Sequence, residues 1–238
     1  MRRYRALACD YDGTIAPEGG RVDPGTLQAL KKVQRSGRKL LLVTGRRISE
    51  LVSIFPALAV FDCIVAENGA VLYNPKAGEQ TMLAPPPPAG FVETLRARGV
   101  DPIWVGSAIV ATVVPHDSIV HSVIRDLKLE LRVFMNKGGV MVLPPGVNKV
   151  SGLNAALKRY GLQPEQVIGV GDAENDEAFL LACGYSVAVA NALQAIKQRV
   201  DLVTKCPHGG GIVELVDRIV DIPAKPATIS THEHKYSE

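Results

Sequence analysis

The stretch ALACDYDGTIA, residues 6–16, joins a short apolar run to two aspartates, Asp10 and Asp12, that stand one residue apart. Residues two apart on a β-strand project to the same side, so Asp10 and Asp12 are expected to face one site while Tyr11 faces away. Gly13 then permits a sharp exit from the sheet. Two carboxylates so placed repel each other, so the pair needs a shared cation, or one of the two must hold a proton.

A calcium loop and a simple turn are the alternative explanations of this D-x-D-G pattern. An EF-hand loop needs glycine at its sixth position and glutamate at its twelfth, whereas here Gly13 is fourth and Arg21 is twelfth. The calcium loop is therefore excluded. A turn without chemistry stays open on this segment alone, because short motifs arise by chance.

Apolar runs with the character of β-strands recur along the chain. They cover residues 5–10, 39–43, 61–66, 166–170, 185–189 and 201–203. Helical patterns lie between several of them: in residues 24–37, Leu27, Leu30 and Val33 share one face, Pro24 suits a first helical position, and Gly37 suits a stop. Alternating strands and helices predict an α/β fold with a doubly wound, Rossmann-like parallel sheet.

The middle of the chain has a different pattern. A helix is expected at 90–99, strands at 103–106 and 108–114, a second helix at 117–128, and strands at 130–135 and 139–143. Closely spaced strands indicate hairpins, so this part predicts a small α+β cap domain. Proline-rich stretches at 85–88 and 143–146 mark its borders. We therefore expect a discontinuous core domain at 1–84 and 144–222, a cap domain at 85–143, and a disordered tail at 223–238.

Composition limits the partners. The 238 residues are 47% hydrophobic, and 27 basic against 24 acidic residues give a net charge of +3 without a long run of one sign. We expect no nucleic-acid partner and, because no run approaches about 18 apolar residues, no membrane partner. The four cysteines lack paired spacing, which favours a reducing, cytoplasmic location. A monomer or a homodimer is expected.

Three further segments could carry chemistry. LLLVTGRR, residues 40–47, is an apolar run leading to Thr44 and Gly45, which could bind an anion or cap a helix. VIGVGDAENDEAF, residues 167–179, crowds acidic residues where a strand ends, and like charges so close need a shared cation. Lys149 follows the second proline-rich stretch; it either lies in solvent at a helix start or meets an anion.

Together these segments resemble the haloacid dehalogenase-like (HAD) phosphatases. The order is DYDGT, then the threonine of VTGR, then Lys149 in GVNK, then GDAENDEAF. The segment AENGAVLYN, residues 66–74, and a cap inserted between the threonine and lysine motifs resemble the branch of Cof-type and archaeal-type phosphoglycolate phosphatases. The resemblance covers roughly residues 5–220, and four spaced motifs in order make it specific.

The resemblance implies a Mg²⁺-dependent phosphomonoester hydrolase with an aspartyl-phosphate intermediate. Asp10 would be the nucleophile, and Asp12 the general acid and then the base. The expected metal ligands are Asp10, the backbone carbonyl of Asp12, Asp172 and, directly or through an outer contact, Asp176. The expected phosphoryl and substrate contacts are Thr44, Gly45, Lys149, Asn68 and Asn175, the last also orienting the metal ligands. The substrate would be a small phosphorylated metabolite, such as phosphoglycolate or a sugar phosphate.

Two other functions remain at this point. A phosphohexomutase of the same superfamily keeps the D-x-D-G-T opening, although the cap here is short for holding a sugar bisphosphate in two orientations. A non-catalytic binding protein is disfavoured by the intact set of motif residues. Five cap residues could contact a substrate: Trp104, His116, His121, Arg125 and Arg132. For each of them, a place on the solvent-exposed surface or in the apolar core is expected instead.

Overall fold

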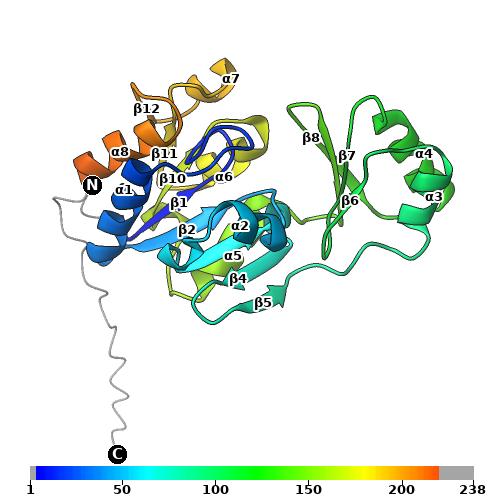
Figure 1. Ribbon diagram of the computed structural model, residues 1–238, viewed down its shortest axis with the longest axis horizontal. Helices are drawn as coiled ribbons and strands as arrows, with labels where there is room; N and C mark the ends of the chain where they lie inside the picture. Colours follow the sequence, from blue (N-terminus) through cyan, green and yellow to red (C-terminus); the bar gives the residue numbers. More distant parts are fainter. Residues whose placement is uncertain (1–3, 220–238) are drawn as a thin grey trace, which may run out of the picture.

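The computed structural model describes residues 4–219, which form two lobes, each built on its own sheet (Figure 1). The larger sheet has the strand order β12-β11-β10-β1-β2-β3-β4-β5. Its strands are β1 (Ala6–Cys9), β2 (Lys39–Val43), β3 (Cys63–Ala66), β4 (Val71–Asn74), β5 (Glu79–Met82), β10 (Val167–Gly171), β11 (Tyr185–Ala188) and β12 (Leu202–Val203). The strands from β12 to β3 are parallel, which confirms the predicted α/β core.

Strand β1 lies at the centre of the core because both of its faces are covered. Ala6 pairs with Val167 of β10 on one side and with Lys39 of β2 on the other. Every β1 residue is buried, as expected for a parallel strand between two helical layers. The strand ends at Cys9, so Asp10 and Asp12 follow the strand instead of lying on it, contrary to the simplest expectation from their spacing.

Helices cover the two faces of the core sheet, and strand alternation decides which side chains they meet. On one face, α1 (Pro24–Arg35), α2 (Ile48–Ile54) and α8 (His208–Ile219) pack on Leu7 and Leu40. On the other, α5 (Lys149–Lys158), α6 (Glu177–Ala182) and α7 (Gln194–Lys197) pack with Ala8 and Leu41. Short 3-10 turns occur at η1 (Leu58–Val60), η2 (Glu67–Gly69), η3 (Pro164–Gln166) and η4 (Glu174–Asp176).

The smaller lobe, residues 91–143, is called the cap below. Its antiparallel sheet has the order β6-β7-β9-β8, with β6 (Trp104–Val105), β7 (Val110–Val113), β8 (Arg132–Asn136) and β9 (Gly139–Leu143). The helices α3 (Phe91–Ala97) and α4 (Asp117–Asp126) share an apolar core with this sheet. The predicted pattern of a helix followed by two strands, given twice, is confirmed, and the predicted ends differ from the observed ones by at most two residues.

The hairpin of β4 and β5 was not predicted. It pairs antiparallel with β3 and extends the parallel sheet at one edge. All four residues of β5 are exposed, so the sequence there carries no apolar pattern. The tail expected at 223–238 lies outside the described residues. Within residues 4–219, no helix is long and apolar enough to cross a membrane.

Candidate active site

The carboxyl ends of the central parallel strands bring the predicted motif residues to one edge of the sheet. Asp10 follows β1, Thr44 follows β2, and Asp172 follows β10. Ligands of open α/β sheets bind at this edge, because the loops after neighbouring strands converge there. Chain segments more than a hundred residues apart therefore meet at one place.

Three buried carboxylates form a cluster at this edge. Oxygen atoms of Asp10, Asp172 and Asp176 lie within 4.8 Å of one another. Asp176 is fixed by its own turn, since its Oδ2 accepts hydrogen bonds from the backbone N–H groups of Asp172 (2.9 Å) and Ala173 (3.1 Å). The cluster can therefore offer oxygen atoms to a cation without a large rearrangement.

Lys149 is the buried counter-ion of this cluster. It begins α5, whose N-cap Asn148 accepts a hydrogen bond from the N–H of Ser151. Its Nζ donates to Asp10 Oδ1 at 2.5 Å and to Asp176 Oδ1 at 2.6 Å, and its side chain is only 3% exposed. The alternative of a solvated lysine at a helix start is therefore wrong.

Burial disfavours the ionised forms of the Asp10 and Asp172 carboxylates. Burial raises the pKa of the Asp10 carboxyl well above its usual value, and Asp176 raises it further, while Lys149 opposes both. Burial also raises the pKa of Asp172, against a hydrogen bond from Lys137. Burial lowers the pKa of the Lys149 ammonium, but Asp10 and Asp176 outweigh it and raise that pKa above its ordinary value. A cation bound in addition to Lys149 and Lys137 would stabilise the ionised carboxylates.

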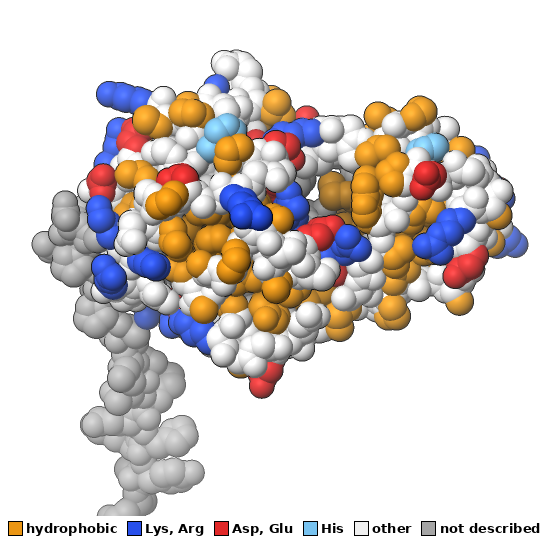
Figure 2. Space-filling view, viewed as in Figure 1, with side chains coloured by type: hydrophobic (Ala, Val, Ile, Leu, Met, Phe, Trp, Pro, Cys, Tyr) orange, Lys and Arg blue, Asp and Glu red, His pale blue; other side chains and the backbone are white. Residues whose placement is uncertain are grey.

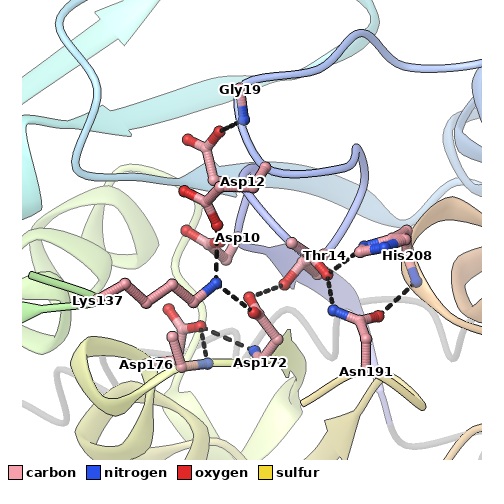
Figure 3. A network of polar contacts seen from close by, with 12 residues as sticks. Asp10, Asp12, Thr14, Gly19, Lys137, Asp172, Asp176, Asn191 and His208 are labelled. Carbon is pink, nitrogen blue, oxygen red and sulfur yellow. Dashed lines mark hydrogen bonds and ion pairs between the residues drawn. The ribbon is translucent and has the colours of Figure 1, made fainter. Parts of the chain in front are cut away.

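Asp12 has a different environment from Asp10, although both line the same pocket. Its two oxygens accept hydrogen bonds from Nε and Nη2 of Arg46, both at 2.6 Å. Its Oδ1 also accepts from the N–H of Gly19 at 3.1 Å (Figure 3). Tyr11, between the two aspartates, is buried and donates its hydroxyl to Gly20 O at 3.2 Å. The Asp12 carboxylate is not part of the cluster.

The loop that carries these aspartates is held by contacts that the sequence analysis missed. Gly13 has φ +80°, and a Cβ there would lie 2.3 Å from Asp172 Oδ2. Its carbonyl accepts a hydrogen bond from Asn191 Nδ2 at 2.8 Å and lies 3.0 Å from His208 Nδ1, while Thr14 donates its hydroxyl to Asp172 Oδ1 at 2.9 Å (Figure 3). His208, to which the sequence assigned no function, thus supports the loop.

Thr44 and Gly45 lie at the floor of the pocket. Thr44 is 1% exposed, and its Oγ1 accepts the N–H of Arg46 at 3.1 Å. No acceptor among the described residues takes the hydroxyl proton, so it can be donated to a ligand. The alternative that Thr44 caps the following helix is wrong, because α2 begins at Ile48 and its N-cap is Arg47.

The two asparagines differ in how near they come to the pocket. Asn175 is among the lining residues, whereas Asn68 is buried behind Gly45 and is not. Asn68 Nδ2 lies 2.9 Å from Met141 Sδ, and within the described chain its Oδ1 has no hydrogen-bond partner. A movement of Met141 would therefore be needed for Asn68 to reach a substrate.

The pocket lies between the two lobes and has a volume of about 240 Å³. Its floor contains Asp10, Asp12 and Thr44, and its cap wall includes Trp104 and Met141. Figure 2 shows the hollow between the lobes, with charged side chains at its rim. Of the candidate cap contacts, Trp104 is a lining residue with 41% of its surface exposed, while His116 is held by Asp101 O at 2.9 Å.

Polar contacts fix the cap against the core, and the sequence analysis found none of them. The buried carboxylate of Glu67 accepts hydrogen bonds from three cap N–H groups, those of Ser107 (2.9 Å), Ala108 (2.9 Å) and Ile109 (3.0 Å). From the cap, Lys137 Nζ donates at 2.8 Å to both Asp172 Oδ2 and Glu18 Oε2. The pocket is thus bridged on both sides.

A capped α/β fold with buried carboxylates, a lysine and a threonine beneath a pocket defines an enzyme site that can hold a cation and an anion together. The profile of the haloacid dehalogenase-like hydrolases matches residues 7–110 and 108–216. The chain belongs to this family of hydrolases.

Similar proteins extend over nearly the whole chain. The phosphoglycolate phosphatase of Methanothermobacter thermautotrophicus is 30% identical over 224 residues, covering 91% of this chain and 99% of that protein. That of Aeropyrum pernix is 27% identical, covering 94% and 96%.

Solved structures agree in fold. A haloacid dehalogenase-like hydrolase from Bacteroides thetaiotaomicron aligns with a TM-score of 0.78 at 20% identity, over 91% of this chain and 99% of that one. A sugar phosphatase of HAD subclass IIB aligns with a TM-score of 0.74 at 19% identity, over 90% and 98%.

Proposed function

We propose that this chain is a Mg²⁺-dependent phosphomonoester hydrolase that acts on a small phosphorylated metabolite through an aspartyl-phosphate intermediate. One observation carries the proposal: Asp10 lies beneath the pocket, within a buried carboxylate cluster that, among residues 4–219, Lys149 and Lys137 partly neutralise. Membership of a hydrolase family and curated relatives that are phosphatases make the chain a phosphatase.

Asp10 is the proposed nucleophile. Its Oδ atom would attack phosphorus while the bond from phosphorus to the substrate alcohol breaks, giving an acyl phosphate on Asp10. Water would then attack the same phosphorus, releasing inorganic phosphate and restoring the carboxylate. The contact with Lys149 keeps the Asp10 side chain fixed beneath the pocket.

Asp12 is the proposed proton carrier. It would donate a proton to the departing alcohol oxygen and later accept one from the attacking water. Both of its oxygens accept hydrogen bonds from Arg46, which holds the Asp12 side chain beside the pocket.

The carboxylate cluster fits a hard divalent cation. Carboxylate oxygens are the ligands that Mg²⁺ prefers, and Asp10 and Asp172 would bind it together with the backbone carbonyl of Asp12 and, directly or at one remove, Asp176. The raised pKa values of Asp10 and Asp172 support such a cation. When bound, it would supply positive charge to the phosphoryl oxygens.

The chain's own donors would complete the phosphoryl site. Lys149 offers a buried positive charge, Thr44 a free hydroxyl proton and Gly45 a backbone N–H at the pocket floor. Phosphoryl transfer depends mainly on positioning and charge stabilisation, which these fixed groups provide. Asn175 would contact the substrate or orient the metal ligands from the pocket wall, and Asn68 would approach the substrate only after Met141 moves.

Phosphoglycolate and sugar phosphates are the proposed substrates, because the curated relatives include phosphoglycolate phosphatases and a structural neighbour is a sugar phosphatase. We propose a cytoplasmic enzyme, which the four free cysteines support, working as a monomer or homodimer without nucleic-acid or membrane partners.

A phosphate-release assay tests the function. The purified protein is incubated with 2-phosphoglycolate, glucose 6-phosphate and an aryl phosphate, with Mg²⁺ or with a chelator. We expect phosphate release that requires Mg²⁺ and is absent in Asp10→Asn. Release from none of the compounds would refute the proposal, and isomerised sugar phosphate without free phosphate would indicate a mutase.

A further inference from the structure

Lys137 is a cap residue whose side chain reaches the core site. It occupies the turn between β8 and β9, where Lys137 (φ 47°) and Gly138 (φ 82°) both have left-handed backbone conformations. From this turn its Nζ extends to Asp172 Oδ2 and Glu18 Oε2, each at 2.8 Å (Figure 3). Among residues 4–219, Lys137 makes both of the side-chain ion pairs that join the cap to the core.

The same hairpin lies on the side of the pocket where a leaving group would sit. In phosphoryl transfer the attacking and leaving oxygens are roughly in line, so a group displaced by Asp10 departs away from the core floor. The opposite wall of the pocket belongs to the cap, and Asn136 and Gly139, which flank the turn, are among its lining residues. Lys137 therefore stands beside the space for the alcohol part of the substrate.

We propose that Lys137 determines substrate specificity by binding a carboxylate on the leaving group, so that the enzyme prefers acidic phosphomonoesters of the phosphoglycolate kind to uncharged ones. The inference rests on the proposed function and adds to it the residue that selects the acidic substrate over the uncharged one.

The contacts of Lys137 suit this role. An ammonium group has three donors, and two of them already bind carboxylate oxygens, so the third is free for a ligand. One third of the side chain is exposed, which leaves a path for a small anion. Glu18 and Asp172 would repel an incoming carboxylate, and Lys137 is the cation placed between them.

The other cations near the pocket are less exposed than Lys137, whose side chain is 33% exposed: the side chain of Arg46 is 22% exposed and that of Lys149 is 3% exposed. Arg46 has its guanidinium in a two-point contact with Asp12, and Lys149 is buried between Asp10 and Asp176. In the cap, Arg98 pairs with Asp126 of α4. Among the cap cations of the described chain, Lys137 is thus the one whose ion pairs reach the site.

A pair of matched substrates tests the inference. 2-Phosphoglycolate carries a carboxylate, and ethyl phosphate has a two-carbon leaving group without one. We would measure kcat/KM for both at saturating Mg²⁺ in the wild type, Lys137→Met, Lys137→Arg and Lys128→Met. Lys128 is a matched control, because it is an exposed cap lysine that also has positive φ (51°) and lies at the end of α4.

We expect Lys137→Met to lower kcat/KM for 2-phosphoglycolate at least about tenfold more than it lowers kcat/KM for ethyl phosphate, the difference typical of one charge-assisted hydrogen bond. Loss of the contact with Asp172 lowers both values alike, so the ratio of the two reports the contact with the leaving group. Lys137→Arg should recover part of the preference, and Lys128→Met should match the wild type.

A second readout is the binding of 2-phosphoglycolate to Asp10→Asn, followed by the fluorescence of Trp104, the single tryptophan. Adding Lys137→Met should weaken that binding by a similar factor.

Equal losses for both substrates would overturn the inference, because Lys137 would then only assemble the site. An unchanged ratio, or a wild type that uses ethyl phosphate as well as 2-phosphoglycolate, would also overturn it. If the wild type releases phosphate from none of the compounds in the wider panel, the proposed function fails instead, so the two failures are distinguishable.

Discussion

Asp10 illustrates how a single residue depends on charges from distant parts of the chain. Its carboxylate is buried next to Asp176 and is balanced by Lys149, which begins a helix 139 residues later. A change of charge at Asp10 without a change of volume should therefore affect chemistry more than folding.

We predict that Asp10→Asn lowers turnover at least about a thousandfold, because an amide cannot act as the nucleophile. The fold should persist, since the buried volume is unchanged. Phosphate release measures the first effect and the melting temperature the second, with Asp117→Asn at the half-buried start of α4 as a control. Substantial remaining activity would remove Asp10 from its role.

Gly13 is a second residue at which a single added atom, a Cβ, should disturb the site. We predict that Gly13→Ala abolishes activity and weakens Mg²⁺ binding in calorimetry, because the new Cβ would overlap Asp172. Gly19→Ala is the matched control: it also has positive φ (64°), but nothing lies within 4 Å of its Cβ. Gly19→Ala should lower the free energy of unfolding by only about 1 kcal/mol, the backbone cost of placing alanine at a positive φ. Similar magnesium affinities in the two variants would contradict this explanation.

At the scale of elements, the start of α1 shows a cap whose effect depends on pH. Asp23 accepts a hydrogen bond from the N–H of Thr26 at 3.0 Å, and its side chain also accepts from the Thr26 hydroxyl. That side-chain hydrogen bond, as the largest cause, lowers the pKa of Asp23 below its usual value. The ionised form is thus favoured in the folded protein.

We predict that Asp23→Ala lowers the free energy of unfolding by about 1 kcal/mol near neutral pH. Because the folded-state pKa is depressed, the ionised Asp23 adds stability above its unfolded pKa of about 3.9, and this is lost as the pH falls through the folded value. Asp23→Ser keeps a cap without the charge, so it should stay near the wild type at pH 7 and lose less stability on acidification. The measurement is the free energy of unfolding in denaturant between pH 7 and pH 3. If the charge has no effect, this free energy should change with pH by the same amount in the wild type and in both variants.

The sequence predicts elements well where burial is uniform. Strands β1 and β10 consist of buried apolar or small residues, so their pattern is visible without partners. Strand β5 is exposed along its length and is specified by its pairing with β4, which no local pattern reports. Asp10, Thr44, Lys149 and Asp172 were found as site candidates because each follows a strand or opens a helix.

The missed site contacts have a common cause. Glu67 binds backbone N–H groups of the cap, His208 lies against a backbone carbonyl, and Lys137 meets a carboxylate 35 residues away. Such contacts depend on how the two lobes and the loops are placed in space. Residue types and spacing alone do not encode them in a recognisable motif.

At the scale of the whole molecule, Glu67 connects the lobes. Its three accepted hydrogen bonds come from consecutive N–H groups in the cap loop between β6 and β7. A glutamine has one acceptor oxygen in place of two, so its amide group would face an N–H donor. The cap would then be held less firmly over the pocket.

We predict that Glu67→Gln speeds amide hydrogen exchange at residues 107–109 and lowers kcat/KM about tenfold, which corresponds to roughly 1.4 kcal/mol. Glu93→Gln, on α3 in the cap, is the control, because among the described residues Glu93 makes no hydrogen bond or ion pair with the core. Exchange rates equal to the wild type would show that Glu67 does not anchor the cap.

The placement of β1 between β2 and β10 also has a consequence during synthesis. Ala6 emerges from the ribosome early, but its partner Val167 is translated only after the entire cap sequence. Until then the nascent chain carries a strand with one unpaired edge, which invites association with other chains. We therefore expect the growing polypeptide to depend on chaperones until β10 has left the exit tunnel, and truncations that end before β10 to aggregate.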